Sequence, residues 1–353
     1  MRNTKTTIIA LTVALIAALA LCSCNLDATD GIYSEIADST ESTSVTLKAF
    51  LGQSADEYYY YLTDDAVRKT KGNNSSQTVF ASSGDSIVWG ASLIDRTNKS
   101  FLVIYEHPST KKASLSYYAT PESAAVELGQ YTGLLTNGLF FNSTTIYRCN
   151  AGAAEAVVSD LKSVEYYLEN GEFAFFCVTK IEDEKTVYKY YIIDADGNKL
   201  FDGITGTSKT YIGFQPLASG TDFILLNYDS SKAKSNLYLL ANGDTEVTKT
   251  VYATLKSSIP YAYGTQAASF RYADDENTYI VFKCSSYFDK VVIADDKADR
   301  DVTQISTRFA ANLRTADITN ILATDTANIF IAGTVSSMLY KIDMNNNKAE
   351  QIK

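Results

Sequence analysis

The chain has 353 residues, of which 31 are basic and 41 acidic, so its formal net charge is −10 at pH 7. This acidity argues against a general role in nucleic-acid binding, because phosphate contacts need clustered cations. Only Cys149, Cys177 and Cys284 follow the amino-terminal region, and an odd number of cysteines in apolar contexts indicates buried free thiols instead of a disulfide framework.

The amino terminus has the features of a secretory signal. Arg2 and Lys5 precede an apolar run from Ile8 to Leu21. A run of 14 residues is too short to cross a hydrocarbon core of about 30 Å. The sequence therefore predicts export, with residues 1–23 as the signal peptide.

The segment "LCSCN" at residues 21–25 resembles the lipobox of bacterial lipoproteins. In that motif a leucine lies three residues before the acylated cysteine and a small residue lies directly before it. Leu21, Ser23 and Cys24 match, whereas Cys22 is unusual at the intermediate position. The resemblance implies that Cys24 carries diacylglycerol and a third acyl chain, such as palmitate, and several chains hold a protein on a membrane where one is marginal. An ordinary secretory signal with two incidental cysteines is the alternative.

Residues 24–53 are predicted to be the lipidated terminus and a tether rich in Ser, Thr and Asp. The stretch "DSTESTS" at residues 38–44 has almost nothing to bury, which is typical of a flexible spacer. The tether can also supply strands to the domain that follows. That domain is predicted to span residues 54–353.

One pattern recurs through the rest of the chain. An aromatic and β-branched run leads into a turn of Asp, Asn, Gly or Pro and then into a second short run. The seven copies are "YYYYLTDDAVRKT" from Tyr58, "LSYYATPESAAVEL" from Leu115, "TIYRCNAGAAEAVV" from Thr145, "YYIIDADGNKLFDG" from Tyr190, "NLYLLANGDTEVTK" from Asn236, "KVVIADDKADRDVTQI" from Lys290 and "MLYKIDMNNNKAEQI" from Met338. Their mean spacing is close to 47 residues, a repeat length found in propeller blades and in helical pairs.

The residue types favour strands over helices. Val, Ile, Tyr, Phe and Thr alternate at period two, with turn residues every 8–12 positions. Each interval between copies holds another strand pair, such as "YIGFQPLASGTDFILLNYD" from Tyr211. We therefore predict an all-β fold, a seven-bladed β-propeller of four-stranded antiparallel blades. Six blades plus an extra hairpin, eight blades, or a blade completed by strands from both chain ends are the alternatives.

Each recurring hairpin is predicted to be the third and fourth strand of a blade. The first blade is the weakest, because its first two strands must come from "GIYSEIA" at 31–37 and "VTLKAFLG" at 45–52. In architecture the chain resembles β-propeller lipoproteins of the bacterial envelope. No named blade signature is present, so the resemblance implies no functional residue beyond Cys24.

Candidate chemical sites are few. Asp194, Asp196 and Asn198 alternate as calcium ligands do, but an EF-hand needs Gly and Glu where Lys199 and Thr205 stand. The same place in other copies holds "ANGDT" and "MNNNK", which are typical of tight hairpin turns. We therefore predict a turn and no metal site or cofactor.

Two single residues and two acidic clusters are further candidates. His107 lacks the companions that a zinc site or a serine triad needs and is predicted to lie in a loop. Trp89 is predicted to pack between blades, with sugar stacking as the alternative. The acidic residues at 64–65 and 274–276 fall at predicted turns, where solvated charge is the simpler interpretation.

Charge is predicted to sort between the two faces of the ring. Turns within strand pairs are mostly acidic, whereas the connections supply cations. The cations between blades are Lys162, Lys209, Lys256, Arg308 and Arg314. A rim formed by these five cations could steer an anionic partner to this face. Loops that are charged only for solubility are the alternative.

The function expected from these features is that of a lipid-anchored envelope protein, on the periplasmic side of a membrane or at the cell surface. Its propeller would be a non-catalytic binding or scaffolding module for another envelope protein, a peptide or an anionic glycan, with no nucleic acid as partner. The alternative is a polysaccharide-active hydrolase or lyase, which requires two or more acidic residues in the central cleft. A structural role in an envelope assembly complex is a third hypothesis.

Overall fold

The computed structural model describes residues 47–353 apart from 64, 72–75, 82–86, 107–111, 171, 209, 218, 258, 260–265, 274–276, 286, 294–301, 311–312, 327–328, 335–337 and 353. Within β21, β25, β27 and β28 the side chains of 272, 308, 310, 319–320, 322–326 and 329–330 are also not described. Residues from 46 to the end form one compact unit. Cys24, His107 and Lys209 lie outside the described residues. In the described part of the chain no helix has the length and apolarity to span a membrane.

The unit is built from seven four-stranded antiparallel sheets, each made of consecutive strands. Blade 1 consists of β1 (Ala49–Gln53), β2 (Tyr59–Leu62), β3 (Ala66–Thr70) and β4 (Gln77–Ala81). Blade 2 consists of β5 (Val88–Asp95), β6 (Ser100–Glu106), β7 (Ala113–Tyr118) and β8 (Val126–Gly129). Blade 3 consists of β9 (Gly133–Leu134), β10 (Phe140–Phe141), β11 (Ile146–Asn150) and β12 (Ala153–Val158).

The later blades follow the same order. Blade 4 consists of β13 (Ser163–Glu169), β14 (Phe173–Glu182), β15 (Lys185–Asp194) and β16 (Lys199–Thr205). Blade 5 consists of β17 (Tyr211–Pro216), β18 (Phe223–Asp229), β19 (Lys234–Leu240) and β20 (Ala253–Thr254). Blade 6 consists of β21 (Ser269–Ala273), β22 (Thr278–Lys283), β23 (Phe288–Ile293) and β24 (Val302–Ile305). Blade 7 consists of β27 (Ile318–Thr326), β28 (Ile329–Thr334), β29 (Leu339–Asp343) and β30 (Lys348–Gln351).

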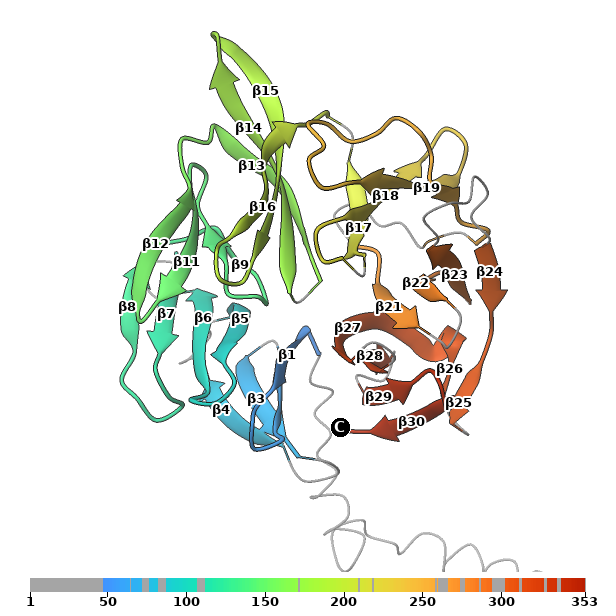
Figure 1. Cartoon of the computed structure of the whole chain (residues 1–353). Helices are drawn as coiled ribbons and strands as arrows, with labels where there is room; N and C mark the ends of the chain where they lie inside the picture. Colours follow the sequence, from blue (N-terminus) through green and yellow to red (C-terminus); the bar gives the residue numbers. More distant parts are fainter. Residues whose placement is uncertain are drawn as a thin grey trace, which may run out of the picture. The chain divides into compact units, whose positions relative to one another are not determined.

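The blades follow one another around a ring in chain order, from blue through green to red in Figure 1. This confirms the prediction of a seven-bladed propeller. A two-stranded sheet, β25 (Arg308–Ala310) with β26 (Leu313–Arg314), and the 3₁₀ turn Thr315–Asp317 lie between blades 6 and 7. All seven recurring hairpins contribute to complete blades, so the alternative of six blades plus an extra hairpin is wrong, and the β25–β26 hairpin is an addition that the repeat pattern did not predict.

Side chains of the middle strands point alternately to the two faces of a blade and are buried on both, which explains why the blades stack. In β14 the sequence "FAFFCVT" places Phe173, Phe175 and Cys177 in the core shared with blade 5. Ala174 and Phe176 belong to the core shared with blade 3. Successive side chains of a strand point to opposite faces, so a run without polar residues is buried on both sides and needs a neighbour on each.

Each pair of adjacent blades shares one apolar cluster among the described residues. The cluster between blades 1 and 7 closes the ring, and it contains Phe50, Tyr61, Ile331, Leu339 and Ile352. Among the strands that the structure describes, no blade contains one from the other end of the chain. Closure therefore depends on side-chain packing and not on a shared sheet.

Two predicted hairpins occupy other positions in their blades. The copy at Tyr58 forms β2 and β3, the second and third strands, because the first blade begins at Ala49. The copy at Asn236 supplies β19, but its polar tail forms no strand and the fourth strand is the short β20. The other five copies form third and fourth strands as predicted.

The antiparallel order defines two faces. The turn face carries the turns that join the first strand to the second and the third to the fourth. The connection face carries the loops between second and third strands and the connections between blades. Because β1 runs from the connection face to the turn face, the chain enters the propeller on the connection face at Lys48.

Candidate functional site

The candidate site is the central channel of the propeller, a cavity of about 520 Å³. All seven blades contribute to its wall, mainly through their innermost strands and the turns that follow them. The charged and amide side chains of the wall are Lys48, Gln53, Arg96, Glu169, Asn170, Glu172, Gln215, Gln266 and Arg271. A cavity of this size is in the usual range for small-ligand pockets.

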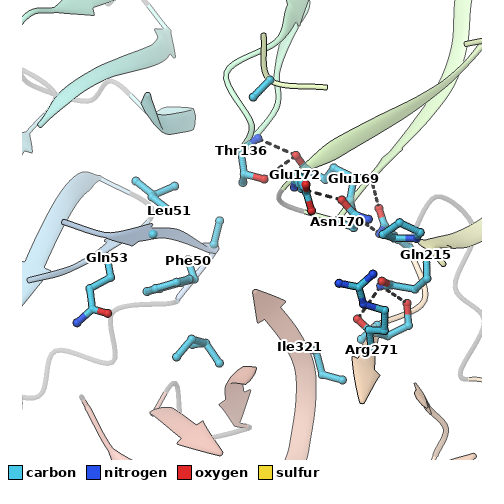
Figure 2. Close-up of a pocket in the computed structure, with 18 of the residues that line it drawn as sticks. Phe50, Leu51, Gln53, Thr136, Glu169, Asn170, Glu172, Gln215, Arg271 and Ile321 are labelled. Carbon is cyan, nitrogen blue, oxygen red and sulfur yellow. Dashed lines mark hydrogen bonds between the residues drawn. The ribbon is translucent and has the colours of Figure 1, made fainter. Parts of the chain in front are cut away.

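One carboxylate of the channel is held by hydrogen bonds from the neighbouring blade. Oε2 of Glu169 accepts the backbone N–H of Thr136 at 2.7 Å and its hydroxyl at 2.8 Å, as Figure 2 shows. Burial raises the pKa of Glu169, and the two bonds from Thr136 partly oppose this shift. The backbone N–H of Glu169 donates to Oε1 of Gln266 at 2.7 Å, and Nε2 of Gln266 donates to the carbonyl of Glu169. These contacts join blades 3 and 4 to the segment that precedes blade 6.

Glu172 is the second carboxylate, and it comes from the same turn as Glu169. Its side chain is exposed in the channel. Oδ1 of Asn170 accepts the backbone N–H groups of Glu172 at 3.1 Å and of Phe173 at 2.8 Å. The turn is therefore fixed by its own asparagine while the Glu172 carboxylate stays accessible.

Cations face these carboxylates from other blades. Nη1 of Arg271 donates to the carbonyl of Leu217 at 3.0 Å, and Nε2 of Gln215 donates to Ser269 O at 3.0 Å and to Ser269 Oγ at 2.9 Å. Figure 2 shows Arg271 and Gln215 on the same side of the channel as Glu172. In the described part of the chain, neither Arg271 nor Arg96 is in an ion pair.

The channel can therefore bind a polar ligand through groups of both signs. Arg271 and Arg96 offer guanidinium donors that suit carboxylate, sulfate or phosphate groups. Glu172 offers an accessible carboxylate. Two acidic residues, Glu169 and Glu172, line the central channel, and the carboxylate of Glu169 is engaged by Thr136.

Of the five cations predicted to form a rim, the three whose side chains are described, Lys162, Lys256 and Arg314, do not line the channel. Lys162 lies between blades 3 and 4, and its Nζ donates to Oγ1 of Thr186 at 2.9 Å. Lys256 is exposed between blades 5 and 6. Arg314 is paired with Asp317, with Nη2 to Oδ1 at 3.0 Å.

The remaining rim positions are less completely described. The backbone of Arg308 is in β25, between blades 6 and 7, and its side chain is not described. Lys209 lies outside the described residues. On the connection face the cations stand among acids, which are Asp160, Asp183, Glu184, Asp229 and Asp317.

The stretch with alternating Asp and Asn is a hairpin turn, as predicted. The backbone N–H and Nδ2 of Asn198 donate to the two carboxylate oxygens of Asp194, both at 2.8 Å. Gly197 has a φ of 84°, a left-handed conformation that glycine adopts without strain. Asp343 with Asn346 and Asp95 with Asn98 repeat this clamp. Among the described residues no group of three or more His, Cys, Asp or Glu is placed to hold a metal ion.

The structure also describes Trp89, the three cysteines and part of the acidic clusters. Trp89 does not pack fully between blades, because it lies in a bulge of β5 and is 47% exposed. Cys177 and Cys284 are buried free thiols, and Cys149 is a half-buried one. Asp65 lies in the turn between β2 and β3, whereas Asp64 and residues 274–276 are outside the described set.

Comparisons with known proteins found distant similarity to solved structures and no family. No protein-family model matches the chain, and no curated protein matches its sequence. Dipeptidyl peptidase 4 of Porphyromonas gingivalis is 8% identical with a TM-score of 0.45, and the match covers 88% of this chain and 53% of that one. A prolyl endopeptidase is 9% identical with a TM-score of 0.49, covering 87% and 49%. This chain thus spans about half the length of these two peptidases.

Two shorter structures are similar over nearly their whole length. The β-propeller domain of the Trilobed protease from Pyrococcus furiosus is 12% identical with a TM-score of 0.43, and the match covers 88% of this chain and 98% of that one. The periplasmic gluconolactonase of Pseudomonas aeruginosa is 9% identical with a TM-score of 0.42, covering 87% and 95%. At these identities and TM-scores the similarity assigns no activity to this chain.

Proposed function

We propose that this chain is a lipid-anchored protein of the bacterial cell envelope whose propeller binds a protein, a peptide or an anionic glycan without catalysing a reaction. The match of Leu21, Ser23 and Cys24 to a lipobox supports the anchor. The body then lies on the periplasmic side of a membrane or at the cell surface.

The central channel carries the proposal of a binding role. Its wall is fixed by hydrogen bonds between blades, such as those of Glu169 with Thr136 and Gln266. The side chains of Arg271 and Glu172 line the channel, where they can contact a ligand. A site supported by rigid elements loses little conformational entropy on binding.

The cations of the connections are a second proposed contact. Lys162, Lys209, Lys256, Arg308 and Arg314 lie between blades in the sequence order of the strands. An anionic segment of another envelope protein, held near the same membrane, would meet them on the connection face. The mutual attraction would raise the association rate more than the final affinity.

Crosslinking and affinity capture from intact cells tests the binding role. The wild type is compared with a channel variant, Glu172→Gln with Arg271→Gln, and with a rim variant in which the five connection cations are Gln. Lys348→Gln, at an exposed position of β30, is the matched control. We expect a specific partner to be lost or reduced in the channel variant, to be reduced also in the rim variant where the connection cations contribute, and to be kept in the control. Recovery of the same proteins in equal amounts from all four would contradict the proposal.

The anchor has its own test. Cys24→Ser removes the proposed acylation site, so radiolabelled palmitate should label the wild type and not the variant. The variant should also move from the membrane fraction to the soluble fraction. Labelling that persists in Cys24→Ser would show that this cysteine is not the lipidated residue.

A polysaccharide-active enzyme is the second candidate, and one observation favours it. Glu169, with its pKa raised by burial, and the exposed Glu172 share one turn in the channel, and glycoside hydrolysis uses two carboxylates. A panel of acidic and neutral glycans, assayed for new reducing ends, separates the two functions. Turnover that is abolished by Glu172→Gln would replace the binding proposal with a catalytic one.

A further inference from the structure

Two large apolar side chains are half-exposed at the point where the chain enters the propeller. Ile87 is 49% exposed and Trp89 is 47% exposed. Nζ of Lys48, the last residue before β1, donates to the carbonyl of Val88 at 3.0 Å. Ile87 and Trp89 therefore flank the residue that the incoming chain contacts.

The backbone holds both side chains outward. The carbonyl of Ile87 accepts the N–H of Glu106 at 3.0 Å, which extends the ladder of blade 2 by one residue. Trp89 is the extra residue of a β-bulge, because Val88 pairs with Tyr105 and Gly90 pairs with Ile104. A bulge turns a side chain away from its regular direction, so the exposure of Trp89 is fixed by the sheet.

Both residues lie at the connection-face end of blade 2. Ile181, near the tip of the long β14–β15 hairpin that extends beyond the ring in Figure 1, and Tyr287 are exposed on the same face. Ile94, at the other end of the strand that carries Trp89, and Val126, at the start of β8, are on the turn face. The apolar pair and the chain's entrance thus share one face.

We propose that Ile87 and Trp89 contact the surface of the membrane that holds the lipid anchor. This inference rests on the anchor at Cys24 in the proposed function. The 22 residues from Asn25 to Thr46 have the composition of a flexible linker, for which an r.m.s. span of about 26 Å is expected. The anchor therefore keeps the connection face near the lipid, and at that effective concentration a weak contact is sufficient.

The chemistry of the patch suits the zone of lipid headgroups. Tryptophan prefers this zone, because its ring is apolar and its N–H is polar. Exposed Lys48 adds a cation beside the pair, and cations near a membrane are attracted by anionic headgroups. With the connection face on the membrane, the turn face and its end of the channel are directed away from the lipid.

Fluorescence gives a direct test, because Trp89 is the single tryptophan of the chain. The lipidated protein is reconstituted in phosphatidylethanolamine and phosphatidylglycerol vesicles, with and without brominated acyl chains that quench indole at short range. We expect emission in the brominated vesicles to fall to about half and to shift to shorter wavelength, since the ring enters the acyl boundary. Ile87→Ser should weaken the quenching, and Val126→Ser, at a position that is 47% exposed on the opposite face, should leave it unchanged.

The outcomes separate the membrane contact from the anchor. Flotation of the protein with the vesicles reports the anchor. If the protein floats and its Trp89 emission is the same with and without brominated lipid, the membrane contact is overturned. The proposed function then stays intact. Protein that does not float contradicts the anchor and, with it, this inference. Quenching that is equally lost in Val126→Ser and Ile87→Ser would also overturn the assignment of the contact to this patch.

Discussion

Glu169 gives the sharpest prediction about the channel wall. Replacing Glu169 by Leu removes the acceptor of two bonds from Thr136, at 2.7 and 2.8 Å, and leaves a partly buried N–H without a partner. A hydrogen bond to a charged group contributes about 1.5–3 kcal/mol. Because the site is open to the channel on one side, we expect a total loss of about 2–4 kcal/mol in the free energy of unfolding.

Urea denaturation followed by fluorescence measures this loss, with Glu172→Leu as the matched control. Glu172 belongs to the same turn and is exposed, so its replacement should change the free energy of unfolding by less than about 0.5 kcal/mol. Equal effects of the two substitutions would refute the assignment of a supporting role to Glu169. A loss below about 0.5 kcal/mol for Glu169→Leu would refute it as well.

Three further predictions concern pH, closure and thiols. Because burial raises the pKa of Glu169 above its usual 4.5, the folded state binds more protons than the unfolded state just above that pH. The stability of the wild type relative to Glu169→Gln should therefore fall as pH rises from 4.5 through the raised pKa, and a urea midpoint difference that is independent of pH would contradict this. Leu339→Ala, in the cluster that joins blades 1 and 7, should cost about 2–5 kcal/mol of unfolding free energy, and a cost below about 1 kcal/mol would argue against packed closure. Burial raises the pKa of Cys177 and of Cys284 to about 12, so a thiol reagent at about pH 8 should label them in urea but hardly in the native protein, and rapid native labelling would contradict their burial.

The ring could be predicted from the sequence because its repeat is local. The aromatic and β-branched strand residues and the Asp-Asn or Asn-Gly turns that follow them both lie within one hairpin, and they recur at a spacing near 47 residues. The prediction that the hairpin at Tyr58 forms the third and fourth strands of blade 1 was wrong. Nothing in the sequence marks whether Tyr58 begins a second or a third strand. The interrupted fourth strand of blade 5 was missed because the polar stretch after Leu240 has the composition of a turn and also of a loop.

The channel could not be predicted in the same way. Its contacts join residues that are far apart in the sequence, such as Glu169 with Gln266, 97 residues later. Polar residues at the ends of innermost strands were the available signal, and Glu169 lies in one of the many acidic turns within strand pairs. Arg271 and Gln215 lie inside predicted strands, where their direction depends on how the blades surround the axis.

Site-specific photocrosslinking tests the central claim, that the propeller binds its partner through the channel. A photoreactive phenylalanine analogue is placed at Gln53, in the channel wall, or at Val126, on the outside of blade 2. Irradiation of intact cells should give a covalent adduct of defined mass from position 53 and none from position 126. An adduct from position 126 alone, or the absence of any adduct at position 53 when the protein is folded and anchored, would contradict the account.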